Sequence, residues 1–180
     1  MTGPWIFGYG SIIWKPGFPF LRRELGFISG WSRRFWQASP DHRGTREQPG
    51  RVVTLMHDPG KRCWGVAYEL SRETCADIFG GLDAREQAGY ERKIMPVCLM
   101  QGQTEIPEAS VYVANEENPC FLGPCSESEL IEQIIKCRGP SGSNMDYVLR
   151  LALSLRDMGV EDPCVFSLER ALLQRSQRSR

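Results

Sequence analysis

The stretch RVVTLMHDPGKRCWGVAYEL, residues 51–70, indicates the class of fold. Both of its ends, residues 51–56 and 63–70, are rich in the β-branched and aromatic residues that favour strands. Between them, the Asp-Pro-Gly sequence at residues 58–60 has the composition of a tight turn, because proline and glycine supply the backbone angles that turns require. The stretch therefore predicts a β-hairpin.

Similar segments fill most of the first two thirds of the chain. They share an enrichment in β-branched and aromatic residues and lie at residues 5–7, 26–37, 94–100 and 110–114. We expect each of them to form a strand.

Helical patterns are concentrated in the last third of the chain. Ser126 and Glu129 have the spacing of a capping box, which starts a helix that Gly139 closes. A second helix can be capped by Ser143 or Asn144. Its apolar positions keep the 3.6-residue spacing of a buried helix face: Val148, Leu151, Ala152 and Leu155.

A third helix is predicted at residues 165–173, after Gly159 has stopped the second. Strands followed by helices predict an α+β fold, either a small β-barrel or a curled mixed sheet with helices packed outside. Residues 1–173 form one domain in this interpretation, and the polar residues 174–180 form a frayed tail.

The composition is that of a compact globular protein. Hydrophobic residues make up 41% of the chain and charged residues 24%, which leaves no place for a disordered or fibrous class. The 22 basic and 22 acidic side chains give no net charge, so we expect neither a nucleic acid nor a membrane surface as partner. No apolar stretch reaches the length of about 20 residues that spans a bilayer.

Cysteine spacing argues against a metal site. The seven cysteines, at positions 63, 75, 98, 120, 125, 137 and 164, include no CxxC pair and have no histidine cluster beside them. We therefore expect no bound metal, reduced thiols that lie mostly in the core, and a cytosolic location.

Residues 7–13, Phe-Gly-Tyr-Gly-Ser-Ile-Ile, form a glycine-bracketed turn after an apolar lead. Glycines on both sides of Tyr9 allow successive N–H groups to converge on an anion or an oxyanion. The alternative is a tight strand-to-helix turn without a ligand. Ile13 stands where the last glycine of a G-x-S-x-G or G-x-G-x-x-G sequence would be, so neither a serine-hydrolase elbow nor a dinucleotide site is completed.

Residues 82–90 could hold an acid–base group. If they are helical, Asp83, Glu86 and Tyr90 share one face while Arg85 points elsewhere. Two neighbouring carboxylates in a dry cleft can share a proton, which suits proton transfer. The alternative is that Asp83 and Glu86 form a capping box with no chemical role.

Two further segments have alternative interpretations. The alternation of Trp, Arg and Phe at residues 31–36 could stack on RNA but is typical of a half-buried strand. The loop at residues 139–144 precedes Tyr147 and could present helix N–H groups to a carboxylate, or could be a capped loop between two helices.

Taken in order, these blocks resemble the ChaC family of γ-glutamylcyclotransferases specific for glutathione. The resemblance rests on blocks that span nearly the whole chain: residues 7–16, 33–37, 41–44, 49–55, 64–68, 82–90, 118–119, 122–124 and 139–144. Near its end the family carries an acidic residue followed two positions later by histidine, whereas this chain has Asp162, Pro163 and Cys164. Residues 101–107 have no counterpart and are given no role.

The resemblance implies an enzyme that converts glutathione, its small-molecule substrate, to 5-oxoproline and cysteinylglycine without a cofactor. Glu86 matches the family's catalytic glutamate, which would shuttle the proton. The substrate-binding residues implied in the same way are Gly8, Tyr9, Gly10, Ser11, Ile12, Ile13 and Tyr147, with Arg51 as a carboxylate partner. The alternative is a catalytically silent module of the same fold that binds γ-glutamyl compounds or a protein.

Overall fold

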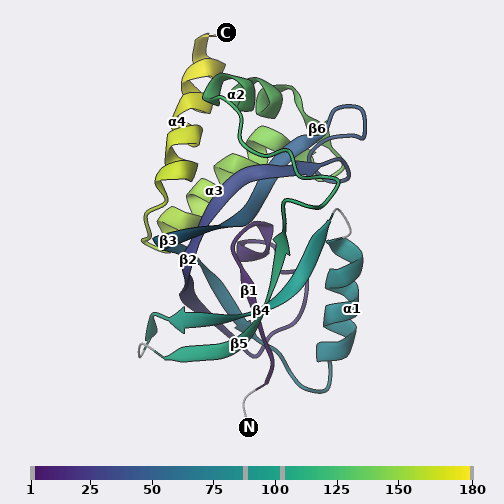
Figure 1. Ribbon diagram of the computed structural model, residues 1–180, viewed down its shortest axis with the longest axis vertical. Helices are drawn as coiled ribbons and strands as arrows, with labels where there is room; N and C mark the ends of the chain where they lie inside the picture. Colours follow the sequence, from purple (N-terminus) through teal and green to yellow (C-terminus); the bar gives the residue numbers. More distant parts are fainter. Residues whose placement is uncertain (1–2, 87–88, 102–103, 179–180) are drawn as a thin grey trace.

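The computed structural model describes residues 3–86, 89–101 and 104–178, and in these ranges five strands close into a barrel with four α-helices outside it (Figure 1). The barrel strands are β1 (Trp5–Gly8), β2 (Arg22–Ser39), β3 (Gly50–Glu69), β4 (Tyr90–Leu99) and β5 (Glu105–Ala114). The helices are α1 (Cys75–Arg85), α2 (Glu127–Lys136), α3 (Asn144–Asp157) and α4 (Pro163–Arg178). A 3₁₀ turn, η1 (Ser11–Ile13), follows β1, and the short strands β6 (Arg138–Gly139) and β7 (Gly142–Ser143) pair with each other. The α+β prediction is confirmed, and the sheet is a barrel.

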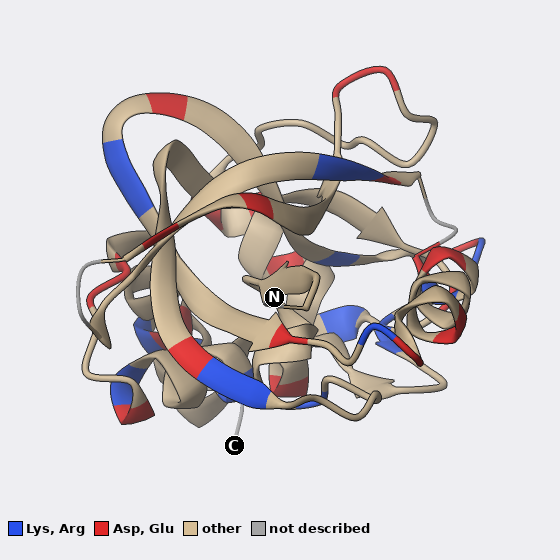
Figure 2. Ribbon diagram, turned by 90° about the horizontal axis from the view of Figure 1, so that it is seen from below, with Lys and Arg blue, Asp and Glu red and all other residues tan. Residues whose placement is uncertain are grey.

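The first strand closes the barrel because it pairs on both sides. Trp5 of β1 is opposite Glu69 of the antiparallel strand β3 and opposite Ala109 of the parallel strand β5. The barrel order is therefore β1-β3-β2-β4-β5, with one parallel pairing in a mixed sheet. Seen from below, the strands curve into a ring and α1 lies outside it on the right (Figure 2).

The predicted hairpin turn at residues 58–60 is wrong. Residues 50–69 form a single long strand, β3, both halves of which run antiparallel to β2. The chain bends between His57 and Arg62, where a bulge faces Gly30 of β2, and Gly30 and Gly60 both have the positive φ that favours glycine. The turn chemistry at residues 58–60 therefore bends the strand without reversing it.

The helices begin at the caps that the sequence predicts. Ser126 Oγ accepts the N–H of Glu129, and the Glu129 carboxylate accepts the N–H of Ser126, so the capping box of α2 is confirmed. Ser143 Oγ accepts the N–H of Asp146 and caps α3. The predicted apolar positions of α3 are fully buried: Val148, Leu151, Ala152 and Leu155.

Three of these helices pack together on one side of the barrel. Helix α3 lies against α2, α4 and β3, while α1 lies on the opposite side of the molecule (Figure 1). Helix α4 runs to Arg178, beyond the predicted end at residue 173, and includes part of the segment expected as a tail. Within the described ranges, no helix is long and apolar enough to cross a membrane.

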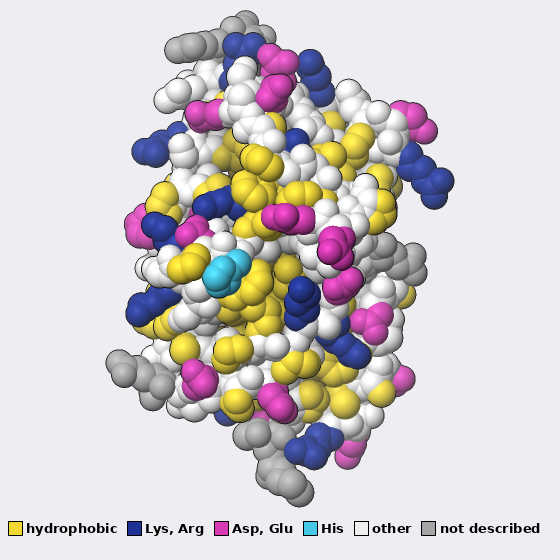
Figure 3. Space-filling model, viewed as in Figure 1, with side chains coloured by type: hydrophobic (Ala, Val, Ile, Leu, Met, Phe, Trp, Pro, Cys, Tyr) yellow, Lys and Arg dark blue, Asp and Glu magenta, His cyan; other side chains and the backbone are white. Residues whose placement is uncertain are grey.

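The distribution of charged side chains and the burial of the cysteines can be compared with the expectations from composition. On the face shown in Figure 3, acidic and basic side chains are mixed, with hydrophobic patches between them. The prediction that most cysteines lie in the core is wrong, because only Cys63 and Cys137 are buried and Cys125 is exposed. The remaining cysteines are half-buried: Cys75, Cys98, Cys120 and Cys164.

Candidate active site

A cavity of about 580 Å³ opens beside the turn that follows β1. Segments far apart in the sequence line it: the glycine turn, the loop between β2 and β3, the end of α1, the starts of β4 and α3, and one side chain of β5. Its polar and aromatic lining residues are Phe7, Tyr9, Ser11, Trp14, Lys15, Ser39, Asp41, His42, Arg43, Arg85, Glu86, Tyr90, Tyr112, Ser141, Tyr147 and Arg150. The structure therefore brings the glycine turn and Glu86 to the same cavity.

The glycine turn is built by close packing. A Cβ on Gly8 would lie 2.5 Å from Cγ2 of Ile12, which is closer than any side-chain atom can approach. The N–H of Ile13 donates to the carbonyl of Gly10 at 3.0 Å and closes the 3₁₀ turn. Because the first N–H groups of a helical turn have no acceptor within it, those of Ser11 and Ile12 are not used by the turn itself. The turn thus lines the cavity and has N–H groups that its own hydrogen bonds do not use; their role as oxyanion donors stays a prediction.

A buried arginine fixes the orientation of this turn. Arg33 Nε donates to the carbonyl of Tyr9 at 2.8 Å, and its Nη1 pairs with Asp162 Oδ2 at 2.5 Å. Since the C=O and N–H of a trans peptide point in opposite directions, the N–H of Gly10 points away from Arg33. Tyr68 Oη donates to the carbonyl of Ile12 at 2.9 Å and holds the other end of the turn.

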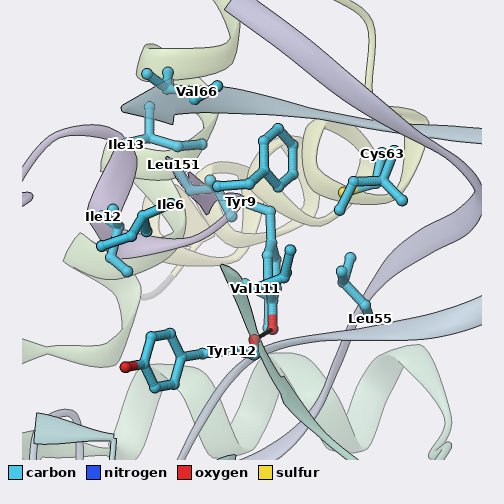
Figure 4. Close-up of a cluster of buried hydrophobic side chains, with 14 of the residues drawn as sticks. Ile6, Tyr9, Ile12, Ile13, Leu55, Cys63, Val66, Val111, Tyr112 and Leu151 are labelled. Carbon is cyan, nitrogen blue, oxygen red and sulfur yellow. Dashed lines mark hydrogen bonds between the residues drawn. The ribbon is translucent and has the colours of Figure 1, made fainter. Parts of the chain in front are cut away.

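The side chain of Tyr9 anchors the turn to the barrel. Its hydroxyl donates to the carbonyl of Tyr112 at 2.6 Å, and its ring lies near Leu55 and Val111 (Figure 4). Burial, and secondly the charge of Glu86, raises the pKa of Tyr9 well above its usual value. Tyr9 is therefore a neutral phenol.

Glu86 lies where α1 ends, so both sequence interpretations of this segment need correction. Its N–H donates to the carbonyl of Leu82 at 2.9 Å, which makes it a C-terminal cap, whereas a capping box requires a helix N-terminus. The helix does not continue to Tyr90, which begins β4. The Glu86 side chain lines the cavity and is 18% exposed.

Burial raises the pKa of Glu86 above the ordinary glutamate value. The charges of Arg85 and then His42 act in the opposite direction, while the charge of Asp41 raises the pKa further. Burial therefore has the largest effect on the pKa of Glu86, and a raised pKa brings proton uptake and release closer to balance at neutral pH.

Asp83 is not the carboxylate partner of Glu86 that the helical spacing suggested. It accepts a hydrogen bond from Tyr112 Oη at 2.6 Å and does not line the cavity. Arg85, expected to point elsewhere, lines the cavity, and its Nε lies 3.4 Å from Glu86 Oε1. Both residues lie within α1, which ends at Arg85, and they point to different places: Asp83 to Tyr112 of β5 and Arg85 to the cavity.

Two further tyrosines lie at the cavity wall. Tyr90 Oη donates to the carbonyl of Val53 at 2.7 Å, and Tyr147 Oη accepts the N–H of Val53 at 3.4 Å. Burial raises the pKa of Tyr147 to about 12, so its hydroxyl is neutral. Tyr147 thus lines the same cavity as the glycine turn, and its contact with the substrate stays a prediction.

Arg51 and Ile13 do not line the cavity. The Arg51 guanidinium is buried and donates to the carbonyls of Phe35 at 3.1 Å and Gly123 at 2.8 Å, and to Gln133 Oε1 at 2.8 Å. The expected carboxylate partner is therefore a structural link between β2, the segment before α2, and α2 itself. Ile13 packs into the hydrophobic core.

The two segments with alternative interpretations have structural roles. The aromatic-basic segment is part of strand β2, in which Arg33 and Phe35 are buried and the other residues of the segment are half-buried. The prediction of a half-buried strand is therefore confirmed. In the loop before α3, Ser143 caps the helix, and the Asn144 side chain bonds both the N–H and the carbonyl of Arg51. Ser141 lines the cavity from this capped loop.

Comparison with known proteins agrees with this arrangement. A sequence model of the family described as ChaC-like protein matches residues 4–175. The chain belongs to the ChaC-like family. It is 43% identical over 174 residues to glutathione-specific gamma-glutamylcyclotransferase 1 of Danio rerio, covering 94% of this chain and 88% of the relative. It is 35% identical to the glutathione-specific gamma-glutamylcyclotransferase of Schizosaccharomyces pombe, covering 98% and 95%.

A solved structure supports the same assignment for the ChaC-like fold. The crystal structure of a yeast gamma-glutamyl cyclotransferase specific to glutathione has a TM-score of 0.89 to this chain at 29% identity. The alignment covers 97% of each chain.

Several cavity residues of this ChaC-like protein were missed by the sequence analysis. Asp41 and His42 stand in a block that carries the family resemblance, but the block suggested no role for them. Arg150 lies three residues after Tyr147 on the same helix face, a spacing that could have found it. This chain differs from the family pattern near Asp162, where it has cysteine in place of histidine. Asp162 itself forms an ion pair with the buried Arg33.

Proposed function

We propose that this protein is an enzyme that cleaves glutathione to 5-oxoproline and cysteinylglycine. Membership of the ChaC-like family and the names of its relatives support this activity. The observation that carries it is that one cavity contains both the half-buried carboxyl group of Glu86 and the glycine turn, whose first N–H groups are not used by the turn itself.

The reaction needs no external nucleophile. The α-amine of the γ-glutamyl group attacks its own γ-carbonyl, a five-membered ring forms, and the amide C–N bond to cysteine breaks. Because the reacting groups belong to one molecule, holding them in line can supply an effective molarity of about 10⁵ M or more. The protein must then remove a proton from the ammonium, stabilise the oxyanion and protonate the leaving nitrogen.

Glu86 is suited to both proton transfers. As a carboxylate it takes a proton from the substrate ammonium, and as a carboxylic acid it gives that proton to the leaving nitrogen. The second proton, which the attacking nitrogen loses as it becomes the lactam N–H, passes through the same carboxylate to the released amine. Burial raises its pKa, which brings proton uptake and release closer to balance at neutral pH. One residue can therefore complete the cycle and end in the state in which it started.

The glycine turn is suited to hold the oxyanion. The N–H groups of Gly10, Ser11 and Ile12 belong to a turn that Arg33 fixes from behind, so little reorganisation is needed during the reaction. Each such donor typically contributes about 3 kcal/mol to the stabilisation of an oxyanion transition state.

The charges of the cavity suit a substrate with two carboxylates. Its basic residues are Lys15, His42, Arg43, Arg85 and Arg150, and its acidic residues are Asp41 and Glu86. Arginine binds carboxylates with strong, directional hydrogen bonds. Glutathione carries a carboxylate at each end and one ammonium, which matches the excess of basic over acidic side chains in the cavity.

A direct assay tests the proposal. Purified protein is incubated with glutathione, γ-glutamylcysteine or γ-glutamylalanine, and 5-oxoproline and cysteinylglycine are measured by mass spectrometry. We expect release of both products from glutathione, in equal amounts. Binding of glutathione by calorimetry without any product would contradict the proposal and would support a silent binding module of the same fold.

A further inference from the structure

Arg85 makes a set of contacts that connect the two halves of the candidate active site. Its Nη2 donates to Ser11 Oγ at 2.9 Å, and its Nη1 donates to the carbonyls of Lys15 at 3.2 Å and Pro16 at 3.1 Å. Its Nε lies 3.4 Å from Oε1 of Glu86. One side chain thus spans the segment after the glycine turn and the carboxyl group at the end of α1.

The shape of the guanidinium makes this connection rigid. Its nitrogen atoms lie in one plane with N–H bonds in fixed directions, so anchoring two of them fixes the third. Here the Nη1 and Nη2 atoms are anchored on residues 11–16, and Nε faces Glu86. The backbone of Glu86 is hydrogen-bonded to Leu82 and Tyr90. Within the described ranges, its carboxylate forms an ion pair with Arg85.

We propose that Arg85 is a positioning residue of the cyclisation, which holds the Glu86 carboxylate at a fixed place relative to the glycine turn. This inference rests on the proposed function, because positioning matters only if Glu86 transfers the proton. In this role, Arg85 aligns the Glu86 carboxylate with the turn that binds the γ-glutamyl group. If Arg85 instead only bound the substrate, its replacement would change KM and not kcat.

The charges around Glu86 also affect its pKa. Arg85 faces Glu86 from α1, and Asp41 and His42 face it from the loop between β2 and β3. Four phenols also interact with its charge, and burial keeps them neutral: Tyr9, Tyr90, Tyr112 and Tyr147. Arg85 opposes the effect of burial on the pKa of Glu86 more strongly than any other residue.

The test compares Arg85→Met with Arg85→Lys. Methionine removes both the charge and the hydrogen bonds, whereas lysine keeps the charge and loses the planar fork. Arg92→Met is the matched control, because Arg92 is exposed, stacks on Phe79 and does not line the cavity. For each variant, kcat and KM for glutathione are measured across pH, and the Glu86 carboxyl is titrated by carbon-13 NMR without substrate.

We expect Arg85→Met to lower kcat by about 100-fold with a smaller change in KM, as for a misplaced catalytic group. We also expect the acid limb of its kcat/KM profile, and the NMR titration of Glu86, to move to higher pH. Arg85→Lys should restore the position of the acid limb but only part of kcat, and Arg92→Met should match the wild type in both.

Two results would overturn the proposal. One is a rise in KM with unchanged kcat and acid limb in Arg85→Met, which would assign Arg85 to substrate binding. The other is an unchanged Glu86 titration in the same variant, which needs no turnover and so remains informative if the wild type releases no 5-oxoproline. Absence of wild-type turnover would contradict the proposed function itself. Circular dichroism confirms that each variant is folded before it is scored.

Discussion

The hydroxyl oxygen of Tyr147 lies 3.1 Å from the position that a Cβ on Gly10 would occupy. Gly10 belongs to the turn after β1 and Tyr147 to the first turn of α3. This close contact therefore brings two segments that are far apart in the sequence together at the cavity. The same hydroxyl accepts the N–H of Val53, whose Cγ2 also lies 3.1 Å from the built Cβ. Position 10 therefore has room for glycine but not for a methyl group without a shift.

We expect Gly10→Ala to lower kcat/KM by about 10- to 100-fold, because even a small displacement of the turn misaligns the substrate. Replacing Tyr147 by Phe removes one of the two atoms that the new Cβ meets. The effect of Gly10→Ala should therefore be smaller in a Tyr147→Phe background than in the wild type. A double-mutant cycle on kcat/KM measures this coupling.

Gly80→Ala is the control for this cycle. A Cβ on Gly80 meets nothing within 4 Å, and Gly80 lies in α1. Alanine should therefore keep the activity and stabilise the helix by roughly 0.5–1 kcal/mol. Equal effects of Gly10→Ala in both backgrounds would show that the Tyr147 hydroxyl does not restrict the turn.

Glu86→Gln should separate activity from stability. We expect turnover to fall by about 10²- to 10⁴-fold, because an amide cannot carry the proton. We expect the melting temperature near neutral pH to rise, because the raised pKa means that the native state disfavours the charged form. Scanning calorimetry and the 5-oxoproline assay measure the two effects on the same sample.

The sign of the stability effect follows from linkage. When the pKa of an acid is higher in the folded state than in the unfolded state, stability is full below the unfolded pKa and decreases as pH rises through the folded pKa. The difference in melting temperature between Glu86→Gln and the wild type should therefore vanish at acidic pH. A variant that melts below the wild type at neutral pH would contradict the raised pKa.

The pH profile of the wild type gives a separate prediction. Proton uptake requires ionised Glu86, so kcat/KM should fall on the acid side at a pH above the ordinary glutamate value of 4.5. The negative charge of Asp41 raises the pKa of Glu86, so Asp41→Asn should move the acid limb to lower pH. An acid limb that stays in place in this variant would remove Asp41 from the electrostatics of the site.

Features set by neighbouring residues could be predicted from the sequence. The capping box of Ser126 and Glu129, the cap at Ser143 and the buried face of α3 all depend on spacing within a few turns. The path of β3 could not, because an Asp-Pro-Gly sequence marks a bend but does not determine whether the next strand returns or continues. That choice depends on the partner strand, because β2 is long enough to pair with both halves of β3.

The site shows the same division. The family resemblance selected Glu86 and the glycine turn, and the structure brings both to one cavity. Arg85 was assigned to the wrong direction because the active face was inferred from the spacing of Asp83, Glu86 and Tyr90, whereas Glu86 ends the helix and Tyr90 begins β4. Arg51 was misplaced because its partners, Phe35, Gly123 and Gln133, come from three separate segments that no local pattern connects.

Arg51→Met tests this correction. Arg51 is 6% exposed, and its guanidinium donates to two carbonyl groups and one amide oxygen. Leaving a buried acceptor without its donor costs about 1–3 kcal/mol, so the free energy of unfolding should fall by at least that amount. Urea denaturation measures this loss, and Arg51→Lys should recover only part of it because lysine lacks the planar fork.

At a temperature at which Arg51→Met is folded, its KM for glutathione should stay close to that of the wild type, because the guanidinium does not line the cavity. A large rise in KM with an unchanged unfolding free energy would return Arg51 to the substrate-binding residues.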